Sequence, residues 1–182
     1  LNPLCLMLSP FALGWVMTYS LTKRFTWWPH LWLGLSLAIA PVGGWLAVTG
    51  GWSSPWWVLV AITIAVATWV AGFDIIYAMQ DLEFDRKIGL FSMPARLGAG
   101  PALVLSTVFH VATIALLLAT AHWMQLGTVA YAGIAVVAGI LFWEHRIVKP
   151  NDLSRVNVAF FSLNGYVSIL LLLTFATDIL MR

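Results

Sequence analysis

Four of the seven acidic residues lie in one short polar stretch, residues 72–94, between two apolar runs. They are Asp74, Asp81, Glu83 and Asp85. If a helix runs through this stretch, at about 100° per residue, Asp81 and Asp85 lie about 20° to either side of Asp74. Tyr77 lies beside them, whereas Glu83 points the opposite way. The spacing therefore predicts three carboxylates on one helix face.

Two interpretations fit such a face. Carboxylates on one stripe repel one another, and this cost falls when they share a divalent cation. Mg²⁺ prefers oxygen ligands, keeps several waters and bridges one or two carboxylates to substrate phosphates. The alternative is a solvated helix end whose acids pair with Arg86 and Lys87. The spacing leaves both open.

A turn is expected to end this helix. Gly89 and Pro94 bracket it, and both residue types interrupt regular structure. The following residues, 89–100, then form either a lid over the carboxylates or an ordinary loop. The spacing does not decide between these two.

The composition shows what holds this stretch in place. Of 182 residues, 62% are hydrophobic and 9% are charged, whereas soluble domains have about 25% charged residues. Most of the surface must therefore face hydrocarbon. The net charge of +2 is too small to suggest nucleic acid. A membrane span needs about 20 mainly apolar residues, and six such stretches are found, at residues 3–19, 31–49, 56–73, 101–120, 126–143 and 156–180.

The basic residues predict which ends of the spans lie together. Eight of the nine occupy the first, third and fifth connections, the second and fourth connections contain none, and Arg182 at the terminus falls on the other side. In order they are Lys23 and Arg24, then Arg86, Lys87 and Arg96, then Arg146, Lys149 and Arg155. Because basic loops stay cytoplasmic, these three connections are predicted to face the cytoplasm from a multi-pass protein of the inner membrane.

The four histidines show no metal-ligand spacing with one another or with Cys5. Each is expected to be a buried or interfacial hydrogen-bonding residue. Glu144 and His145 are possible acid–base partners, but adjacent residues diverge in direction on a helix.

The acidic stretch and the first connection resemble motifs of one family. The second aspartate-rich motif of the UbiA superfamily of intramembrane prenyltransferases resembles the run Asp74-x-x-Tyr77-Ala-Met-Gln-Asp81-x-x-x-Asp85-x-Lys87-x-Gly89-x-x-Ser92. The tyrosine–lysine loop that precedes that motif is similar to the run Tyr19-Ser20-x-x-Lys23-Arg24-Phe-Thr. The final span is also similar, through Asn157, Asn164 and Tyr166. The resemblance covers essentially the whole chain.

The resemblance implies an all-α, polytopic transmembrane bundle that contains six of the nine helices of the UbiA-type fold. The family's first motif, Asn-Asp-x-x-Asp-x-x-x-Asp, does not occur in the sequence. The chain also begins inside an apolar run at Leu1, with no charged segment before it, so it is not expected to start with a signal peptide. We therefore expect a single transmembrane prenyltransferase domain over residues 1–182 that is N-terminally incomplete and inactive by itself.

The resemblance also implies an activity. The intact enzyme is expected to transfer a polyprenyl group from a polyprenyl diphosphate to an aromatic acid, with Mg²⁺ as cofactor. 4-Hydroxybenzoate, in ubiquinone-type biosynthesis, is the first acceptor considered, and a dihydroxynaphthoate on a menaquinone route is the alternative. A membrane transporter is the alternative of another class, although transporters place ionisable groups near the midplane and this chain collects them at span ends. Beyond substrates and membrane lipid, no nucleic acid and no obligate protein partner are expected.

The implied site residues fall into three groups. The metal ligands are Asp81, Asp85 and Asp74, of which Asp74 and Asp81 are also catalytic candidates, Asp74 as the group that removes the ring proton or polarises the phenol. The diphosphate contacts are Lys23, Arg24, Tyr19 and Lys87, although Lys23 and Arg24 are alternatively plain topology determinants. The substrate contacts are Tyr77, Ser20 and Asn164.

Overall fold

The computed structural model describes residues 1–181 and contains six helices that are long and apolar enough to cross a membrane. The six predicted spans are therefore confirmed, with bounds that differ by a few residues. The helices are α1 (Pro3–Thr22), α2 (Pro29–Thr49), α3 (Trp56–Ala78), α6 (Ala99–Trp123), α7 (Thr128–Ile147) and α8 (Asn164–Leu180). A π-helical turn, Val158–Leu163, leads into α8.

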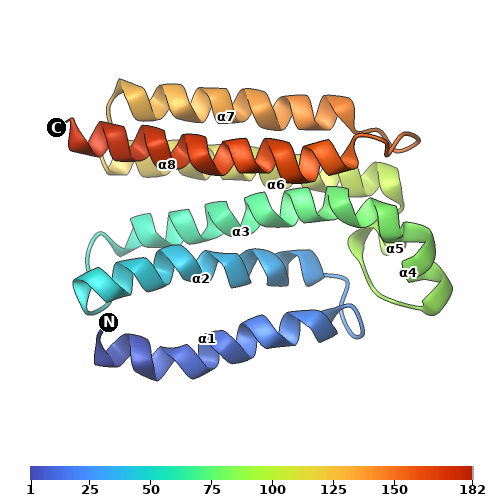
Figure 1. Cartoon of the computed structure of the whole chain (residues 1–182), viewed down its shortest axis with the longest axis horizontal. Coiled ribbons are helices and arrows are strands. Elements are labelled where there is room, and N and C mark those ends of the chain that lie inside the picture. The colour runs from blue at the N-terminus through green and yellow to red at the C-terminus, as the bar shows by residue number, and fades with distance from the viewer. Residues whose placement is uncertain (182) are drawn as a thin grey trace.

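The six helices run back and forth side by side, and α3 lies at the centre of the bundle (Figure 1). It packs against α2 on one side and α6 on the other, and most of its length is buried. Two glycines allow this close packing: Gly34 of α2 lies against the backbone of Ala67, and Gly72 of α3 lies against the ring of His110. A side chain at either position would collide, and small residues bring helices together in membranes in this way.

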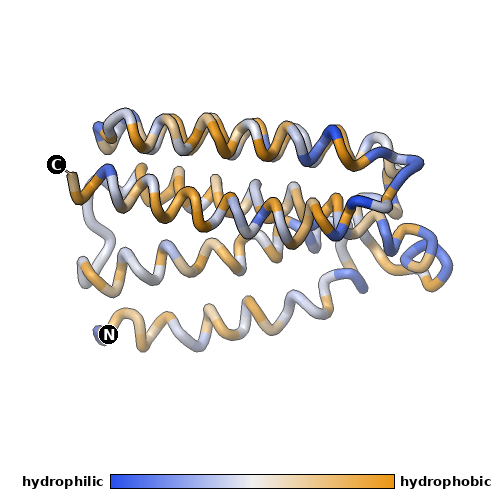
Figure 2. The backbone as a smooth tube through the Cα atoms, turned by 45° about the horizontal axis from the view of Figure 1, so that its top comes forward, coloured by the Kyte–Doolittle hydropathy of each residue, from blue (hydrophilic) through white to orange (hydrophobic). Residues whose placement is uncertain are grey.

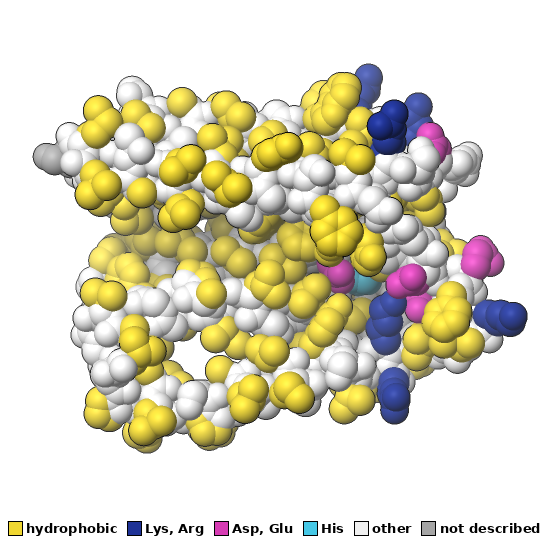
Figure 3. All heavy atoms as spheres, in the orientation of Figure 1, with side chains coloured by type: hydrophobic (Ala, Val, Ile, Leu, Met, Phe, Trp, Pro, Cys, Tyr) yellow, Lys and Arg dark blue, Asp and Glu magenta, His cyan; other side chains and the backbone are white. Residues whose placement is uncertain are grey.

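One end of the bundle carries the connections α1–α2, α3–α6 and α7–α8, and we call it the polar end (Figure 1). Hydrophilic residues gather there, whereas the helices are largely apolar along their length (Figure 2). Basic and acidic side chains also collect at this end on the face drawn in Figure 3. The prediction that the three basic connections share one end is confirmed, and their cytoplasmic location stays a prediction.

The acidic stretch does not form one continuous α-helix. α3 ends at Ala78, a 3₁₀ turn follows over Met79–Asp81, and α4 then runs from Leu82 to Ile88. Because a 3₁₀ turn has three residues per turn instead of 3.6, it rotates Asp81 and the residues after it by roughly 60° relative to α3. The prediction of a single stripe is therefore wrong in detail: Asp74 and the pair Asp81 and Asp85 belong to two differently oriented segments.

Gly89 ends α4 with a φ of 73°, which confirms the predicted turn. The chain then reverses through a short helix, α5 (Met93–Leu97), which Ser92 caps by accepting a hydrogen bond from the Ala95 N–H. We call residues 89–98 the lid segment after the first of the two interpretations, and a role as a lid stays a prediction. It is shorter than expected, because α6 already begins at Ala99.

Candidate active site

Lys23 lies between two carboxylates of the acidic stretch. Its Nζ atom is 3.1 Å from Oδ2 of Asp85 and 3.4 Å from Oδ2 of Asp81. The Asp85 side chain is buried, with 1% exposed, whereas that of Asp81 is 51% exposed. A buried carboxylate requires a paired charge or hydrogen bonds, and Lys23 supplies both for Asp85. The loop after α1 and the helix α4 therefore form one charged site.

The lid segment packs against this site. The Phe91 N–H donates a 2.7 Å hydrogen bond to the carbonyl of Lys23. The Phe91 ring meets the ring of Trp27 edge to face, with centroids 4.8 Å apart, and Arg96 lies 4.2 Å above the Trp27 ring. These contacts join the lid segment to the α1–α2 connection, beside the carboxylates.

Asp74 lies in a different set of contacts. Its Oδ2 atom is 2.7 Å from Nδ1 of His30, at the start of α2. Nε2 of the same ring accepts a hydrogen bond of 3.3 Å from the Met93 N–H of the lid segment. Asp74 and His30 are both buried. His30 is thus a buried hydrogen-bonding residue, as predicted, but nothing in the sequence pattern indicated that its partner is Asp74.

The carboxylates fit only part of a metal site. Among the residues that the structure describes, no three His, Cys, Asp or Glu side chains come together as a complete site. Asp81 and Asp85 do offer adjacent carboxylate oxygens, of which one is accessible from outside. Mg²⁺ typically binds through one or two carboxylates, with waters and substrate phosphates completing its shell. The donor set therefore fits a magnesium ion that is held jointly with a diphosphate.

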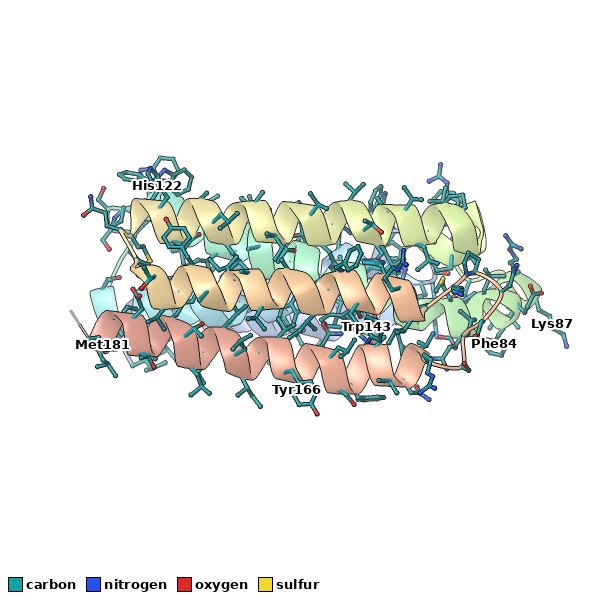
Figure 4. All side chains as sticks on the ribbon, turned by 90° about the horizontal axis from the view of Figure 1, so that it is seen from above. Phe84, Lys87, His122, Trp143, Tyr166 and Met181 are labelled. Atoms are coloured by element: carbon teal, nitrogen blue, oxygen red, sulfur yellow. The ribbon has the colours of Figure 1, made fainter. Side chains whose placement is uncertain are left out.

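The remaining predicted diphosphate contacts differ in position. Tyr19 is half-buried near the end of α1, in the electrostatic field of Asp74 and Asp81. Arg24 is exposed and pairs with no acidic residue in the described part of the chain. Lys87 is exposed and points away from the bundle (Figure 4). Ser20, a predicted substrate contact, is exposed and donates to the carbonyl of Met17. Of these four, only Tyr19 is close enough to interact electrostatically with the carboxylates, and none of them forms a hydrogen bond to a carboxylate within the described residues.

A family model of known proteins matches residues 1–166, and its description is "UbiA prenyltransferase family". The chain belongs to the UbiA prenyltransferase family. It is 31% identical over 173 residues to a 4-hydroxybenzoate octaprenyltransferase of Vibrio campbellii, which covers 95% of this chain and 59% of the relative. It is 35% identical over 144 residues to the mitochondrial 4-hydroxybenzoate polyprenyltransferase of Arabidopsis thaliana, which covers 79% of this chain and 35% of that protein.

A solved structure of a UbiA homolog from Aeropyrum pernix K1 superposes with a TM-score of 0.85 and 35% sequence identity. The match covers 98% of this chain and 66% of that one. The chain thus has the UbiA fold over nearly all of its length, and it spans about a third to three fifths of the curated relatives that it matches.

A row of aromatic rings in the UbiA chain joins α3 to the π-helical turn. The ring of Tyr77 packs on Phe160 of the π-helical turn, with centroids 4.2 Å apart. Phe160 meets Phe73 edge to face at 5.3 Å, and Phe73 meets Trp69 at 5.5 Å. The predicted substrate contact Tyr77 is therefore one member of a row. Phe160 was missed, because a phenylalanine in an apolar span gives no signal by its type or spacing.

Asn164, the third predicted substrate contact, is engaged by the protein itself. Its Oδ1 atom accepts from the Trp69 indole at 2.8 Å. Its Nδ2 atom donates to the Ala159 carbonyl at 3.0 Å and to Oε1 of Glu144 at 3.4 Å. These bonds tie the π-helical turn to α3 and α7. A substrate contact by Asn164 stays a prediction, although the amide's hydrogen-bonding groups are already used.

A second polar cluster lies inside the UbiA bundle, between α6 and α7. Glu144 is fully buried, and within the described chain its Oε2 atom makes no hydrogen bond. This atom is 3.7 Å from Nδ1 of His110, which is itself 3.0 Å from Nε2 of His145. Glu144 and His145 do diverge, as expected for neighbours on a helix, but both approach the same histidine.

Proposed function

We propose that the whole protein transfers a polyprenyl group from a polyprenyl diphosphate to an aromatic acid, with 4-hydroxybenzoate as the acceptor in ubiquinone-type biosynthesis. The observation that carries this proposal is the position of Lys23 between Asp81 and Asp85, because a cation beside paired carboxylates suits a metal-bound diphosphate. The two curated relatives are both named as 4-hydroxybenzoate prenyltransferases, which supports the same acceptor.

The polar end holds the diphosphate in this proposal. Asp81 and Asp85 provide the carboxylate ligands of Mg²⁺, which when bound supplies positive charge that stabilises the departing diphosphate. Lys23 donates hydrogen bonds to the phosphate oxygens from the loop after α1. Tyr19 is placed to donate another. The polar end faces the cytoplasm of the inner membrane, where both soluble and membrane-bound substrates can reach it.

The chemistry requires one bond to break and another to form. The allylic carbon–oxygen bond breaks, and the diphosphate leaves with the electron pair. The electron-rich ring carbon of the acceptor then bonds to the allylic carbon, and the ring loses a proton. Asp74 either accepts this proton or polarises the phenol of the acceptor. Tyr77, one helical turn after Asp74, packs on Phe160. Aromatic faces stabilise a passing cation, and the apolar surroundings exclude water.

The test uses membranes that contain the full-length protein. They are incubated with Mg²⁺, a polyprenyl diphosphate, and either 4-hydroxybenzoate or a dihydroxynaphthoate, and the prenylated product is identified by mass spectrometry. We expect product from 4-hydroxybenzoate that is lost in Asp81→Ala. Product from the dihydroxynaphthoate alone would show that this acid, and not 4-hydroxybenzoate, is the acceptor. No product from either acid, or unchanged turnover in Asp81→Ala, would refute the proposal.

A further inference from the structure

His30 belongs to none of the recognised motifs, but it lies in an unusual position. It follows Pro29 in the first turn of α2, and 1% of its surface is exposed. One ring nitrogen faces a carboxylate of α3, and the other faces a main-chain N–H of the lid segment. Both nitrogens are therefore engaged by groups whose own roles as donor or acceptor are known.

These partners decide which nitrogen carries the proton. The Met93 N–H can only donate, so Nε2 of His30 must offer its lone pair. An ionised Asp74 can only accept, so Nδ1 must carry the hydrogen that it donates. The structure therefore assigns the neutral Nδ1–H tautomer of His30. A hydrogen bond to one ring nitrogen commonly sets the state of the other in this way.

The hydrogen bond between His30 and Asp74 also determines which carboxylate oxygen of Asp74 is left available. Oδ2 is held by His30, and the structure gives this carboxylate no other hydrogen bond within the described residues. Oδ1 thus remains available to an acceptor molecule. Asp74 forms no ion pair with Lys23, which is instead shared by Asp81 and Asp85. His30 therefore keeps Asp74 oriented separately from the diphosphate site.

We propose that His30 is a positioning residue, which orients Asp74 toward the acceptor and does so only when the lid segment is in place. If the lid segment moves away, the Met93 N–H no longer fixes the tautomer of His30. The proton is then no longer confined to Nδ1, the nitrogen that donates to Asp74. This inference rests on the proposed function for its kinetic consequence, but its tautomer assignment can be measured without turnover.

The experiment compares His30→Leu, His30→Gln and the wild type in the full-length protein. Leucine removes both hydrogen bonds. Glutamine keeps a donor and an acceptor about as far apart as the two ring nitrogens. We expect His30→Leu to lower kcat by about 10- to 100-fold, the range seen when the partner that orients a reactive group is removed. The KM for the polyprenyl diphosphate should stay unchanged, and His30→Gln should recover most of kcat. His122→Leu is the matched control, because His122 is exposed at the opposite end of the bundle (Figure 4).

Three results would overturn the inference: full kcat in His30→Leu, equal loss in folded His30→Gln and His30→Leu, or a rise in diphosphate KM that accounts for the whole loss. Thermal unfolding in detergent establishes that each variant is folded. Nitrogen NMR of isotope-labelled histidine, assigned by the signals that disappear in His30→Gln, gives an independent result. The Nδ1–H form is expected, and the Nε2–H form would refute the assignment. A wild type that has the Nδ1–H form but prenylates no acid would refute the proposed function and leave this assignment standing.

Discussion

Lys23 and Asp85 are 62 positions apart in the sequence, and Lys23 Nζ lies 3.1 Å from Asp85 Oδ2. The carboxylate is almost completely buried, whereas the ammonium group is partly exposed. Removing one partner of such a pair costs more than the pair itself contributes, because the other charge is left buried without compensation. The loop after α1 therefore stabilises the acidic stretch, in addition to the diphosphate binding proposed for it.

This relationship predicts the effect of Lys23→Met. The variant should unfold at lower temperature in detergent, with a loss of about 1–3 kcal/mol, because the buried Asp85 side chain loses its hydrogen-bonding partner. The KM for the polyprenyl diphosphate should also rise in the full-length enzyme. Arg24→Met is the stability control, since Arg24 is exposed and forms no ion pair in the described chain. Equal stability of the two variants would contradict the role given to Lys23.

The separation of Asp74 from the other two carboxylates predicts different kinetic defects. Asp81→Asn should raise the Mg²⁺ concentration needed for half-maximal activity, because a metal ligand is weakened. Asp74→Asn should lower kcat by about 100-fold or more, as expected when a general base is lost, and leave the Mg²⁺ requirement unchanged. Titrating Mg²⁺ for both variants tests this. The same shift in both would place Asp74 among the metal ligands.

The close approach of α2 to α3 predicts the effect of a single methyl group. In Gly34→Ala the new Cβ would meet the backbone of Ala67, which cannot move aside easily. Stability should fall by about 1–3 kcal/mol, the usual cost of overpacking. Gly44→Ala in the same helix adds its methyl in open space and should leave stability equal or slightly higher. Thermal unfolding of the two variants in one detergent is the measurement, and matching curves would refute the packing described.

The buried Glu144 predicts opposite effects for two substitutions. Glu144→Gln replaces the oxygen that has no hydrogen-bond partner by an amide group that can donate toward His110, so stability should stay equal or increase. Glu144→Ala removes a fully buried side chain, leaves a cavity between α6 and α7, and should cost about 2–5 kcal/mol. Detergent unfolding midpoints compare them. If Glu144→Gln were as unstable as Glu144→Ala, the Oε2 atom of Glu144 would have a hydrogen-bond partner that the structure does not show.

The spans and the shared polar end could be predicted because both depend on composition: long apolar runs, and basic residues in alternate connections. The grouping of Asp81 with Asp85 followed from helical spacing. The departure of Asp74 did not, because the 3₁₀ turn at Met79–Asp81 contains no glycine or proline that would indicate it. The turn arises where α3 leaves the packed bundle, and a sequence does not reveal that position to within one residue.

Contacts between segments that are distant in the sequence could not be predicted either. His30 and Asp74 are 44 positions apart, and the pairing depends on how α2 packs against α3. Phe160 and the hydrogen bonds of Asn164 depend in the same way on how the π-helical turn lies against α3. The proximity of Lys23 to the acidic stretch could be expected only from the family resemblance, since no local pattern joins the two connections.

Two of the hydrogen bonds that hold the lid segment run from Phe91 to the carbonyl of Lys23 and from Met93 to the ring of His30, and both are donated by a peptide nitrogen. Nineteen of the twenty amino acids supply that group, and proline alone does not. A substitution at position 91 or 93 therefore keeps these hydrogen bonds, but it alters the ring contact of Phe91 with Trp27 or the buried packing of Met93. A proline at either position would remove one of these hydrogen bonds, and a homologue that carries it must hold residues 89–98 by other contacts.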